Sequence, residues 1–99
     1  MKRLDNHFSF QWDKGNLDKN PIKHGITPTQ AEEIFTDENL QVNPDIKHSQ
    51  TESRFIGIGK TTENQILFTI FTFRNNHIRI ISSRLTNKKE RTLYETQIA

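Results

Sequence analysis

The chain has 99 residues, 31% of them apolar, with a net charge of +2 and no cysteine. This length is typical of a single domain with a small core. Without cysteine the chain can have no disulfide, no thiolate zinc site and no cysteine nucleophile. No apolar stretch is long enough to cross a membrane, and no secretory signal follows Met1, so we expect a cytoplasmic protein that does not bind membranes.

The charges are unevenly distributed along the chain. Residues 30–52 hold six acids and one base, whereas residues 53–94 hold eight bases and two acids. Five of those eight bases are arginine, whose guanidinium can bind a phosphate through two parallel hydrogen bonds. Two differently solvated faces would explain the same pattern. Charge alone therefore indicates an anion-facing surface and leaves its purpose open.

The front of the chain carries a short strand signal and a weak helix signal. Residues 8–12 alternate between aromatic and polar side chains, which predicts a half-buried strand. A short helix over about 14–23 is expected next, although Pro21 interrupts it. Gly25 suits the end of that helix.

A much clearer helix begins at the segment Thr27-Pro28-Thr29-Gln30. Thr27 and Gln30 form a capping box, and Pro28 occupies the first helical position. Apolar residues then follow at helical spacing, so one stripe of this helix should be buried. We expect it to end near residues 37–39.

The back of the chain alternates between strands and turns. We expect strands over residues 40–43, 54–60, 65–73 and 77–83, with a polar loop over 44–52. Gly57 and Gly59 share one face of their strand, which indicates the close approach of another element or a bulge. Asn75-Asn76 predicts a two-residue hairpin turn. In the strand that follows, Arg79 points to the face opposite its isoleucine neighbours. A last helix over about 87–97, capped by Thr86, completes the chain.

Strands grouped apart from helices predict an α+β fold. We expect a small antiparallel sheet with two N-terminal helices packed on one face, a C-terminal helix, and the other face partly open. Residues 1–99 should form a single domain, with residues 1–7 as an N-terminal extension.

The chemistry-bearing side chains narrow the function. Four histidines are present, and no pair has HxxxH or HExxH spacing, so we expect neither a metal nor a cofactor. The remaining Lys, Arg, His, Glu and Tyr side chains suffice for metal-free cleavage of RNA, because RNA supplies its own 2′-hydroxyl nucleophile. The protein must take that proton, stabilise charge on the phosphorane and protonate the leaving 5′-oxygen.

Each candidate residue also has a structural interpretation. His24 could cap a helix end, and Glu52 could form an ordinary ion pair with Arg54. Arg79 could face solvent as readily as a ligand. Glu90 and Tyr94, four residues apart on the last helix, could simply support that helix. None of these residues identifies a site by itself.

Several blocks in a fixed order carry a family resemblance. They are Trp12-Asp13, Asn20, Lys23-His24-Gly25-Ile26, Ala31 and Phe35, then Asp45, His48, Glu52, Arg54 and Ile58-Gly59, and finally the block from Arg79 to Arg84 with Glu90-Arg91 and Tyr94. This order resembles the BrnT family of type II toxins, compact relatives of the RelE-like ribonucleases, over about residues 12–95.

The resemblance implies a RelE-like α+β fold and a metal-independent endoribonuclease that inhibits translation and growth. It implies a BrnA-like antitoxin partner with a ribbon-helix-helix DNA-binding part, in a hetero-oligomer. That complex would repress its own operon and would reach operator DNA only through the antitoxin.

The matched blocks also imply which residues act. The catalytic group would be Lys23, His24, Glu52, Arg54, Arg79 and Arg84. In it the three arginines bind the phosphate, Lys23 or His24 acts on a proton, and Glu52 is a base or orients an arginine. The residues expected to contact RNA are Lys88, Lys89, Arg91 and Tyr94. Tyr94, together with Glu90, could instead fix the last helix against the sheet.

Two departures from the family pattern support an alternative. Asn16 replaces a usual lysine, and Pro21 stands where a helix former is usual. The chain could therefore be a degenerate toxin that only holds its antitoxin on DNA. A DNA-binding regulator acting alone ranks last, because the sequence has no helix-turn-helix pattern and no long basic helix.

Overall fold

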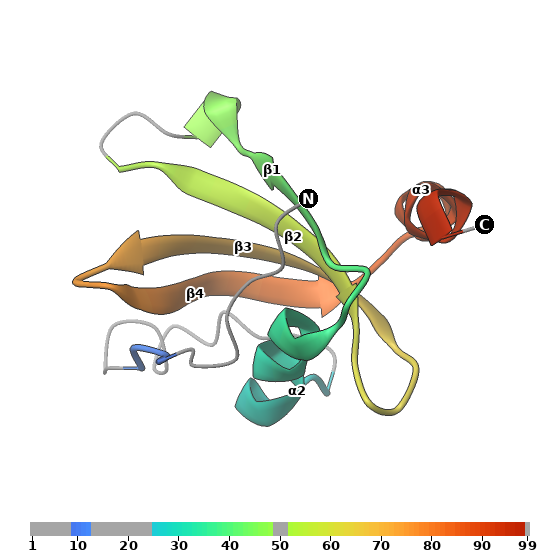
Figure 1. Ribbon diagram of the computed structural model, residues 1–99, viewed down its shortest axis with the longest axis horizontal. Coiled ribbons are helices and arrows are strands. Elements are labelled where there is room, and N and C mark those ends of the chain that lie inside the picture. The colour runs from blue at the N-terminus through green and yellow to red at the C-terminus, as the bar shows by residue number, and fades with distance from the viewer. Residues whose placement is uncertain (1–8, 13–24, 49–51, 99) are drawn as a thin grey trace.

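A computed structural model describes residues 9–12, 25–48 and 52–98 of the chain. In chain order its elements are α2 (Pro28–Glu33), the 3-10 helix η1 (Ile34–Thr36), β1 (Gln41–Pro44), the 3-10 helix η2 (Ile46–His48), β2 (Arg54–Lys60), β3 (Ile66–Arg74), β4 (His77–Leu85) and α3 (Lys88–Ile98). The four strands form one antiparallel sheet in the order β1-β2-β3-β4 (Figure 1). The α+β class and the antiparallel sheet are therefore confirmed.

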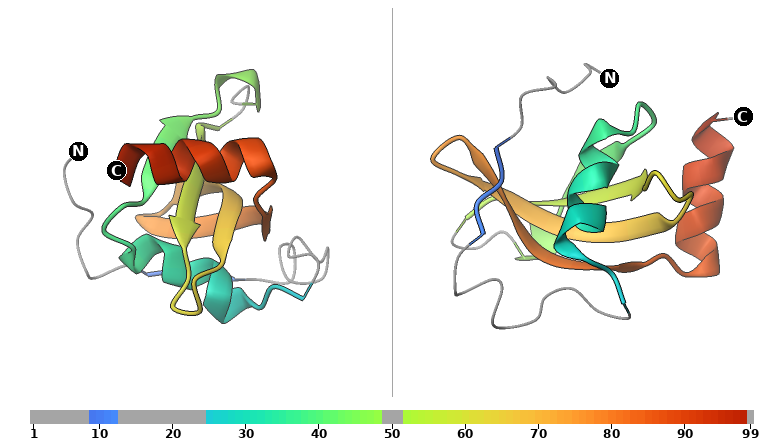
Figure 2. Two further views of the ribbon diagram at one scale, coloured as in Figure 1. Left: turned by 90° about the vertical axis from the view of Figure 1, so that its right-hand side faces the viewer. Right: turned by 90° about the horizontal axis from the view of Figure 1, so that it is seen from below.

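The helix positions correct part of the expected architecture. The two described α-helices are α2, in the middle of the chain, and α3, at its C-terminal end, rather than two N-terminal helices. α2 lies on one face of the sheet, and α3 lies across the strands at the end away from the β3–β4 turn (Figures 1 and 2). The expected helix over 14–23 lies outside the described residues.

The start of α2 follows its sequence signal closely. The Thr27 hydroxyl accepts a hydrogen bond from the Gln30 backbone, and the Gln30 side chain accepts one from the Thr27 backbone. The predicted capping box is thus confirmed. The α-helix ends at Glu33 and is followed directly by the 3-10 helix η1, which ends at Thr36. The helical segment therefore ends slightly before residues 37–39, where its end was expected.

The main core lies between α2 and the sheet. Ile34 and Phe35 pack there against Leu67, Phe71 and Ile80. The helical segment approaches β2 very closely. A Cβ atom added to Gly59 would lie 2.9 Å from the Ile34 Cβ and 3.1 Å from the Ile34 carbonyl oxygen. The glycine pattern therefore marked a close approach, and a larger side chain would push the helix off the sheet.

The turns also match their sequence signals. Asn75 and Asn76 both adopt positive φ angles, 53° and 65°, as a two-residue hairpin turn between right-twisted strands requires. Residues 9–12 form a smaller element than the expected strand. They pair with β4 through a single parallel bridge between Phe10 and Ile78, and Phe10 and Trp12 pack against the main core.

An irregularity in β4 has the largest consequence for the site. Ile70 of β3 pairs with Ser82, but the next residue, Phe71, pairs with Ile80, so Ile81 is an extra residue in β4. This is a β-bulge, and it shifts the alternation of the strand by one residue. Odd-numbered side chains before Ile81 and even-numbered side chains after it therefore lie on the same face of the sheet.

The start of α3 corrects a further expectation. Asn87, rather than Thr86, caps the helix: its side chain accepts from the Glu90 backbone at 2.8 Å, and Glu90 accepts from the Asn87 backbone at 2.9 Å. The buried Thr86 hydroxyl instead donates to the Ile66 carbonyl. Thr86 thereby ties the end of β4 to the start of β3, two residues before the helix begins. The segment over 44–52, expected to be all loop, contains η2.

Candidate active site on the open face of the sheet

The sheet face opposite α2, here called the open face, carries two arginines in one row. Arg54 pairs with Thr72, and Thr72 pairs with Arg79, so the three side chains lie side by side across β2, β3 and β4. Adjacent strands are about 4.8 Å apart, which places the two arginine backbones about 10 Å from each other. Both arginines are half-buried. We call Arg54, Thr72 and Arg79 the arginine row.

Thr72 holds the middle of this row. Its side chain is 1% exposed, and its hydroxyl donates to the Ser53 carbonyl at 2.6 Å. The two guanidinium groups come from the strands on either side of this short side chain. The row is therefore suited to bind an anion with several oxygens, such as a phosphate, from two sides.

A cleft of about 300 Å³ extends from the arginine row toward α3. Four apolar side chains and three polar ones line it, and we call it the open-face cleft. Its lining residues are Asp45, Arg54, Ile56, Phe68, Ile70, Ile81 and Ser82. Ser82 faces this side of the sheet because of the bulge, since it pairs with Ile70 of the open face.

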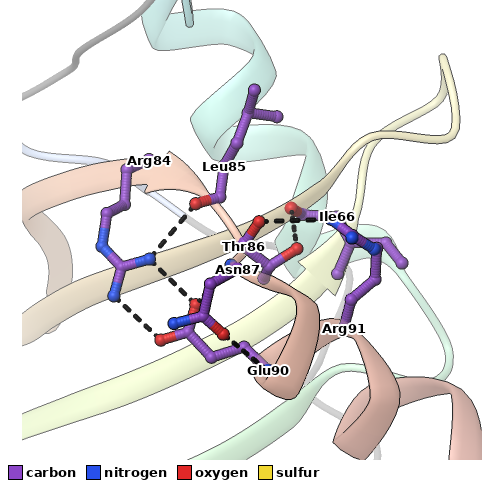
Figure 3. Close-up of polar contacts among 7 residues, drawn as sticks. All are labelled: Ile66, Arg84, Leu85, Thr86, Asn87, Glu90 and Arg91. Carbon is purple, nitrogen blue, oxygen red and sulfur yellow. Dashed lines mark hydrogen bonds and ion pairs between the residues drawn. The ribbon is translucent and has the colours of Figure 1, made fainter.

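Arg84 also faces the open side because of the bulge, but it is already engaged. Its guanidinium donates two hydrogen bonds, each 2.8 Å, to the two carboxylate oxygens of Glu90 (Figure 3). It also lies 4.2 Å from the centre of the Phe68 ring. These hydrogen bonds raise the pKa of Arg84 above its ordinary value and lower that of Glu90. Arg84 thus joins β4 to α3.

Tyr94 is a second residue that attaches α3 to the open face. The side chain is 1% exposed and packs with Ile58 and Ile66. Its hydroxyl donates to Asp37, whose carboxylate also accepts from the Lys60 backbone at 2.7 Å. Burial, and then the bond to Asp37, raise the pKa of this phenol above its usual range.

The buried position of Tyr94 decides between its two expected roles. A side chain that is 1% exposed cannot stack on RNA while α3 stays in place. The structure therefore does not fit the expectation that Tyr94 contacts RNA. Tyr94 fixes the last helix against the sheet instead. Gln41 supports the same attachment, because its amide donates to the carbonyls of Leu93 and Tyr94 at 3.3 Å each.

The remaining expected site residues are spread over the molecule. Glu52, for which the sequence suggested a pair with Arg54, forms an ion pair with Arg74 at 3.2 Å. Lys88, Lys89 and Arg91 are exposed on α3, which makes this helix the basic end of the open face. Lys23 and His24 lie outside the described residues.

Sequence reasoning missed the cleft and the bulge that shapes it. The signal for the bulge was present in the run Ile80-Ile81-Ser82-Ser83, where apolar residues stop alternating with polar ones. In the paired strands, Ser83 is 1% exposed and its hydroxyl lies 2.9 Å from that of Thr69, on the α2 side. That side-chain pair confirms that the alternation has shifted by one residue.

The described residues show neither a metal cluster nor a membrane helix. No three acidic or histidine side chains in this part of the chain lie close enough together to hold a metal ion. No described helix is long and apolar enough to cross a membrane.

The fold and site define a small α+β protein with an arginine-bearing sheet face suited to a phosphate-containing ligand. The family described as the ribonuclease toxin BrnT of type II toxin–antitoxin systems matches residues 12–90. The chain therefore belongs to the BrnT family, and the predicted resemblance is confirmed. Membership implies a ribonuclease toxin with an antitoxin partner. A comparison with curated proteins finds no match.

Proposed function

We propose that the protein is a type II toxin that cleaves RNA as a metal-independent endoribonuclease and thereby inhibits translation and growth. The observation that carries this proposal is the arginine row: two half-buried guanidinium groups on one sheet face, in a chain of a ribonuclease toxin family. A phosphodiester between Arg54 and Arg79 would have its non-bridging oxygens bound from both sides.

In the proposed reaction the RNA supplies the nucleophile. The 2′-oxygen forms a bond to phosphorus while the bond from phosphorus to the 5′-oxygen breaks, leaving a 2′,3′-cyclic phosphate and a 5′-hydroxyl. One proton leaves the 2′-hydroxyl, and one is delivered to the 5′-oxygen. Arg54 and Arg79 stabilise the added negative charge on the phosphorane, which is the task that best matches their geometry.

The proton transfers are assigned to residues outside the arginine row. Lys23 or His24 would act on one proton. Glu52 would serve as a base or, through its ion pair, orient Arg74 toward the RNA. Arg84 would act on the phosphate only indirectly, because Glu90 already occupies its guanidinium. We therefore assign Arg84 to positioning α3 and the ring of Phe68.

We further propose a BrnA-like ribbon-helix-helix antitoxin as the partner, in a hetero-oligomer that represses its own operon. The exposed cations of α3, Lys88, Lys89 and Arg91, would steer RNA toward the cleft or be covered by an acidic antitoxin surface. Operator DNA would be contacted through the antitoxin alone. The toxin is expected to act in the cytoplasm, where its RNA substrate is found.

A second candidate function is a catalytically degenerate toxin that acts only as an antitoxin-binding module. Two observations favour it: the guanidinium of Arg84 is committed to Glu90, and Tyr94 is buried. Two residues from the matched blocks are therefore not presented to a ligand. The departures at Asn16 and Pro21 point the same way, although they lie outside the described residues.

One assay separates the two candidates. Purified protein would be incubated with labelled RNA in excess chelator, and the ends of any fragments would be determined. Fragments with 2′,3′-cyclic phosphate and 5′-hydroxyl ends support the ribonuclease, and addition of the antitoxin should abolish them. RNA binding without cleavage supports the degenerate module. Cleavage that requires an added divalent cation would contradict the metal-independent mechanism.

A further inference from the structure

His77 is a histidine of the open face to which the proposed mechanism gives no role. It is the first residue of β4 and pairs with Arg74 across the hairpin. Its neighbours Ile78 and Ile80 are buried in the main core, on the α2 side of the sheet. Because side chains alternate along a strand, His77 lies on the opposite face, two residues from Arg79. Such residues are about 7 Å apart, so the His77 ring lies beside the arginine row.

The backbone next to His77 is held at both edges of its strand. On one side, β4 pairs with β3 along its length. On the other side, the Ile78 N–H donates to the Ser9 carbonyl, and the Gln11 N–H donates to the Ile78 carbonyl, each at 2.8 Å. These bonds fix the direction in which the imidazole leaves the strand. A group that must meet a substrate in one position requires such a fixed base.

The surroundings of the His77 ring differ between its two nitrogens. The side chain as a whole is half-buried, but Nδ1 is buried and has no hydrogen-bond partner among the described residues. Arg74, opposite His77 in the sheet, directs its guanidinium to Glu52 at 3.2 Å. A ligand on the open face can therefore meet this ring at Nε2 and not at Nδ1.

The buried Nδ1 indicates where the neutral ring carries its hydrogen. A neutral imidazole has one N–H donor, and its other nitrogen is an acceptor. Among backbone groups, buried N–H donors without a partner are rarer than under-satisfied acceptors. By the same reasoning we expect the hydrogen on Nε2 and a bare lone pair on the buried Nδ1. Nε2 then presents a donor to the open face.

This tautomer separates hydrogen bonding from proton transfer at His77. A histidine that takes up a proton at Nε2 must already carry a hydrogen at Nδ1, and one that delivers a proton from Nε2 must carry hydrogens on both nitrogens. Each state would place an unpaired N–H at the buried Nδ1, which costs free energy. Donation of a hydrogen bond from Nε2 requires no such state.

From this geometry we propose that His77 is a further catalytic residue, which donates a hydrogen bond from Nε2 to a non-bridging oxygen of the scissile phosphate. The inference rests on the proposed ribonuclease and adds a donor beside the arginine row. A fixed donor stabilises the charge that grows on those oxygens as the 2′-oxygen attacks phosphorus. The Nε2–H bond stays intact throughout, and both protons of the reaction move through other groups.

Three variants of His77 distinguish a donor at the position of Nε2 from other roles of the ring. His77→Gln places an amide N–H near that position, whereas His77→Asn places it nearer the position of Nδ1. His77→Ala should slow RNA cleavage about 100-fold, the usual loss when one donor to a transition-state oxygen is removed. His77→Gln should recover at least about tenfold of that loss, and His77→Asn should stay close to His77→Ala.

The glutamine variant also excludes a role as a base, because an amide does not take up a proton at neutral pH. A His77→Gln protein that cleaves no faster than His77→Ala would overturn the proposal. Lys47→Ala removes an exposed positive charge from η2, and as the control it should cleave at the normal rate. Urea unfolding of each variant verifies that the fold is retained.

A change of leaving group tests whether His77 delivers a proton. The substrate is a DNA strand with one ribonucleotide, which supplies one 2′-hydroxyl, joined to the next nucleotide through a 5′-oxygen or a 5′-sulfur. A thiolate leaves without being protonated, so loss of a general acid has little effect on the sulfur substrate. His77→Ala should be slowed by the same factor on both substrates. A deficit that disappears with sulfur would make His77 the general acid and overturn the proposal.

NMR measures the same contact without catalysis. The four histidine rings of ¹⁵N-labelled protein would be observed at about pH 8, where free histidine is neutral. The signals missing from His77→Gln identify His77, which should show a hydrogen on Nε2. RNA with 2′-O-methyl groups, which cannot supply the nucleophile, should shift that N–H signal. A hydrogen on Nδ1, or RNA binding that leaves the Nε2–H signal unmoved, would overturn the proposal.

Failure of the proposed ribonuclease would give a different set of results. If the unaltered protein cleaves neither the oxygen nor the sulfur substrate, the ribonuclease proposal fails, and the NMR titration still decides whether His77 donates to RNA. If the unaltered protein cleaves RNA and His77→Ala cleaves it equally fast, the ribonuclease stands and the role proposed for His77 is wrong.

Discussion

Arg79 and Arg84 lie on the same strand and on the same face of the sheet, but their surroundings differ. Arg79 stands across Thr72 from Arg54, with the open-face cleft next to the row. Arg84 lies at the other end, where Glu90 of α3 takes up both of its terminal nitrogens. Arg84 thus attaches a helix, whereas the ligand-binding role of Arg79 on the same strand is our proposal.

This difference indicates that the two ends of the open face have different roles. The α3 end of the open face is closed by Tyr94, which covers Ile58 and Ile66. The other end carries Arg54 and Arg79. Among the described helices, α3 lies at the opposite end of the strands from the β3–β4 turn (Figure 2). Stability should therefore depend on residues at the α3 end, and activity on residues in the arginine row. The predictions below test that division, from the largest effect to the smallest.

The largest effect is expected from Tyr94→Ala. Tyr94 is the buried member among the described α3 side chains, and truncation of a buried aromatic residue costs ~3–5 kcal/mol. The free energy of unfolding in urea should fall by about that amount. Leu93→Ala, at a neighbouring position that is 53% exposed, is the matched control and should change it by about 0.5 kcal/mol or less. Equal losses in the two variants would contradict the proposed attachment of α3.

Arg79→Ala should greatly slow RNA cleavage without affecting the fold. Removal of one group that stabilises transition-state charge slows reactions by about 100-fold or more. The rate of RNA cleavage should fall by at least that factor while the urea midpoint stays close to that of the unaltered protein. Lys47→Ala removes an exposed positive charge from η2 and should cleave at the normal rate. An Arg79→Ala variant with normal cleavage would remove the arginine row from the mechanism.

The Arg84–Glu90 pair should contribute to stability at an intermediate level. The bonds are bidentate, but the Arg84 side chain is 42% exposed, so solvent screens the pair. A double-mutant cycle with Arg84→Ala and Glu90→Ala should give a coupling free energy of about 1 kcal/mol. A coupling near zero would mean that α3 is held by Tyr94 and its hydrogen bonds without help from the ion pair.

The smallest effect concerns acid pH. Hydrogen bonds from Arg84 lower the pKa of Glu90 in the folded protein, below an unfolded value of about 4.3. The pair therefore stabilises the fold above that unfolded pKa, and its contribution is lost as pH falls through the folded pKa. Urea unfolding should show a stability difference between the unaltered protein and Arg84→Ala that is constant from neutral pH to about 5. Below about pH 4 the difference should shrink, and a constant difference would contradict the assignment to Glu90.

Local signals determined much of the fold from the sequence alone. The capping box at Thr27, the hairpin turn at Asn75-Asn76 and the closely approached Gly59 depend on backbone geometry that a few adjacent residues specify. The order of the matched blocks determined the family, which the comparison over residues 12–90 confirms. The placement of Arg79 on the face opposite its isoleucine neighbours also followed from simple alternation.

Only the tertiary structure decided how these parts meet. The bulge at Ile81 arises from the pairing register of β3 with β4, and it brings Arg84 to the face of Arg79 although five positions separate them. The partners of Arg84 and Tyr94, and the cleft between Asp45 and Phe68, join residues that lie far apart along the chain or on different elements. Local propensities do not encode such contacts, because they depend on which strands pair, in which register, and on which face the last helix lies.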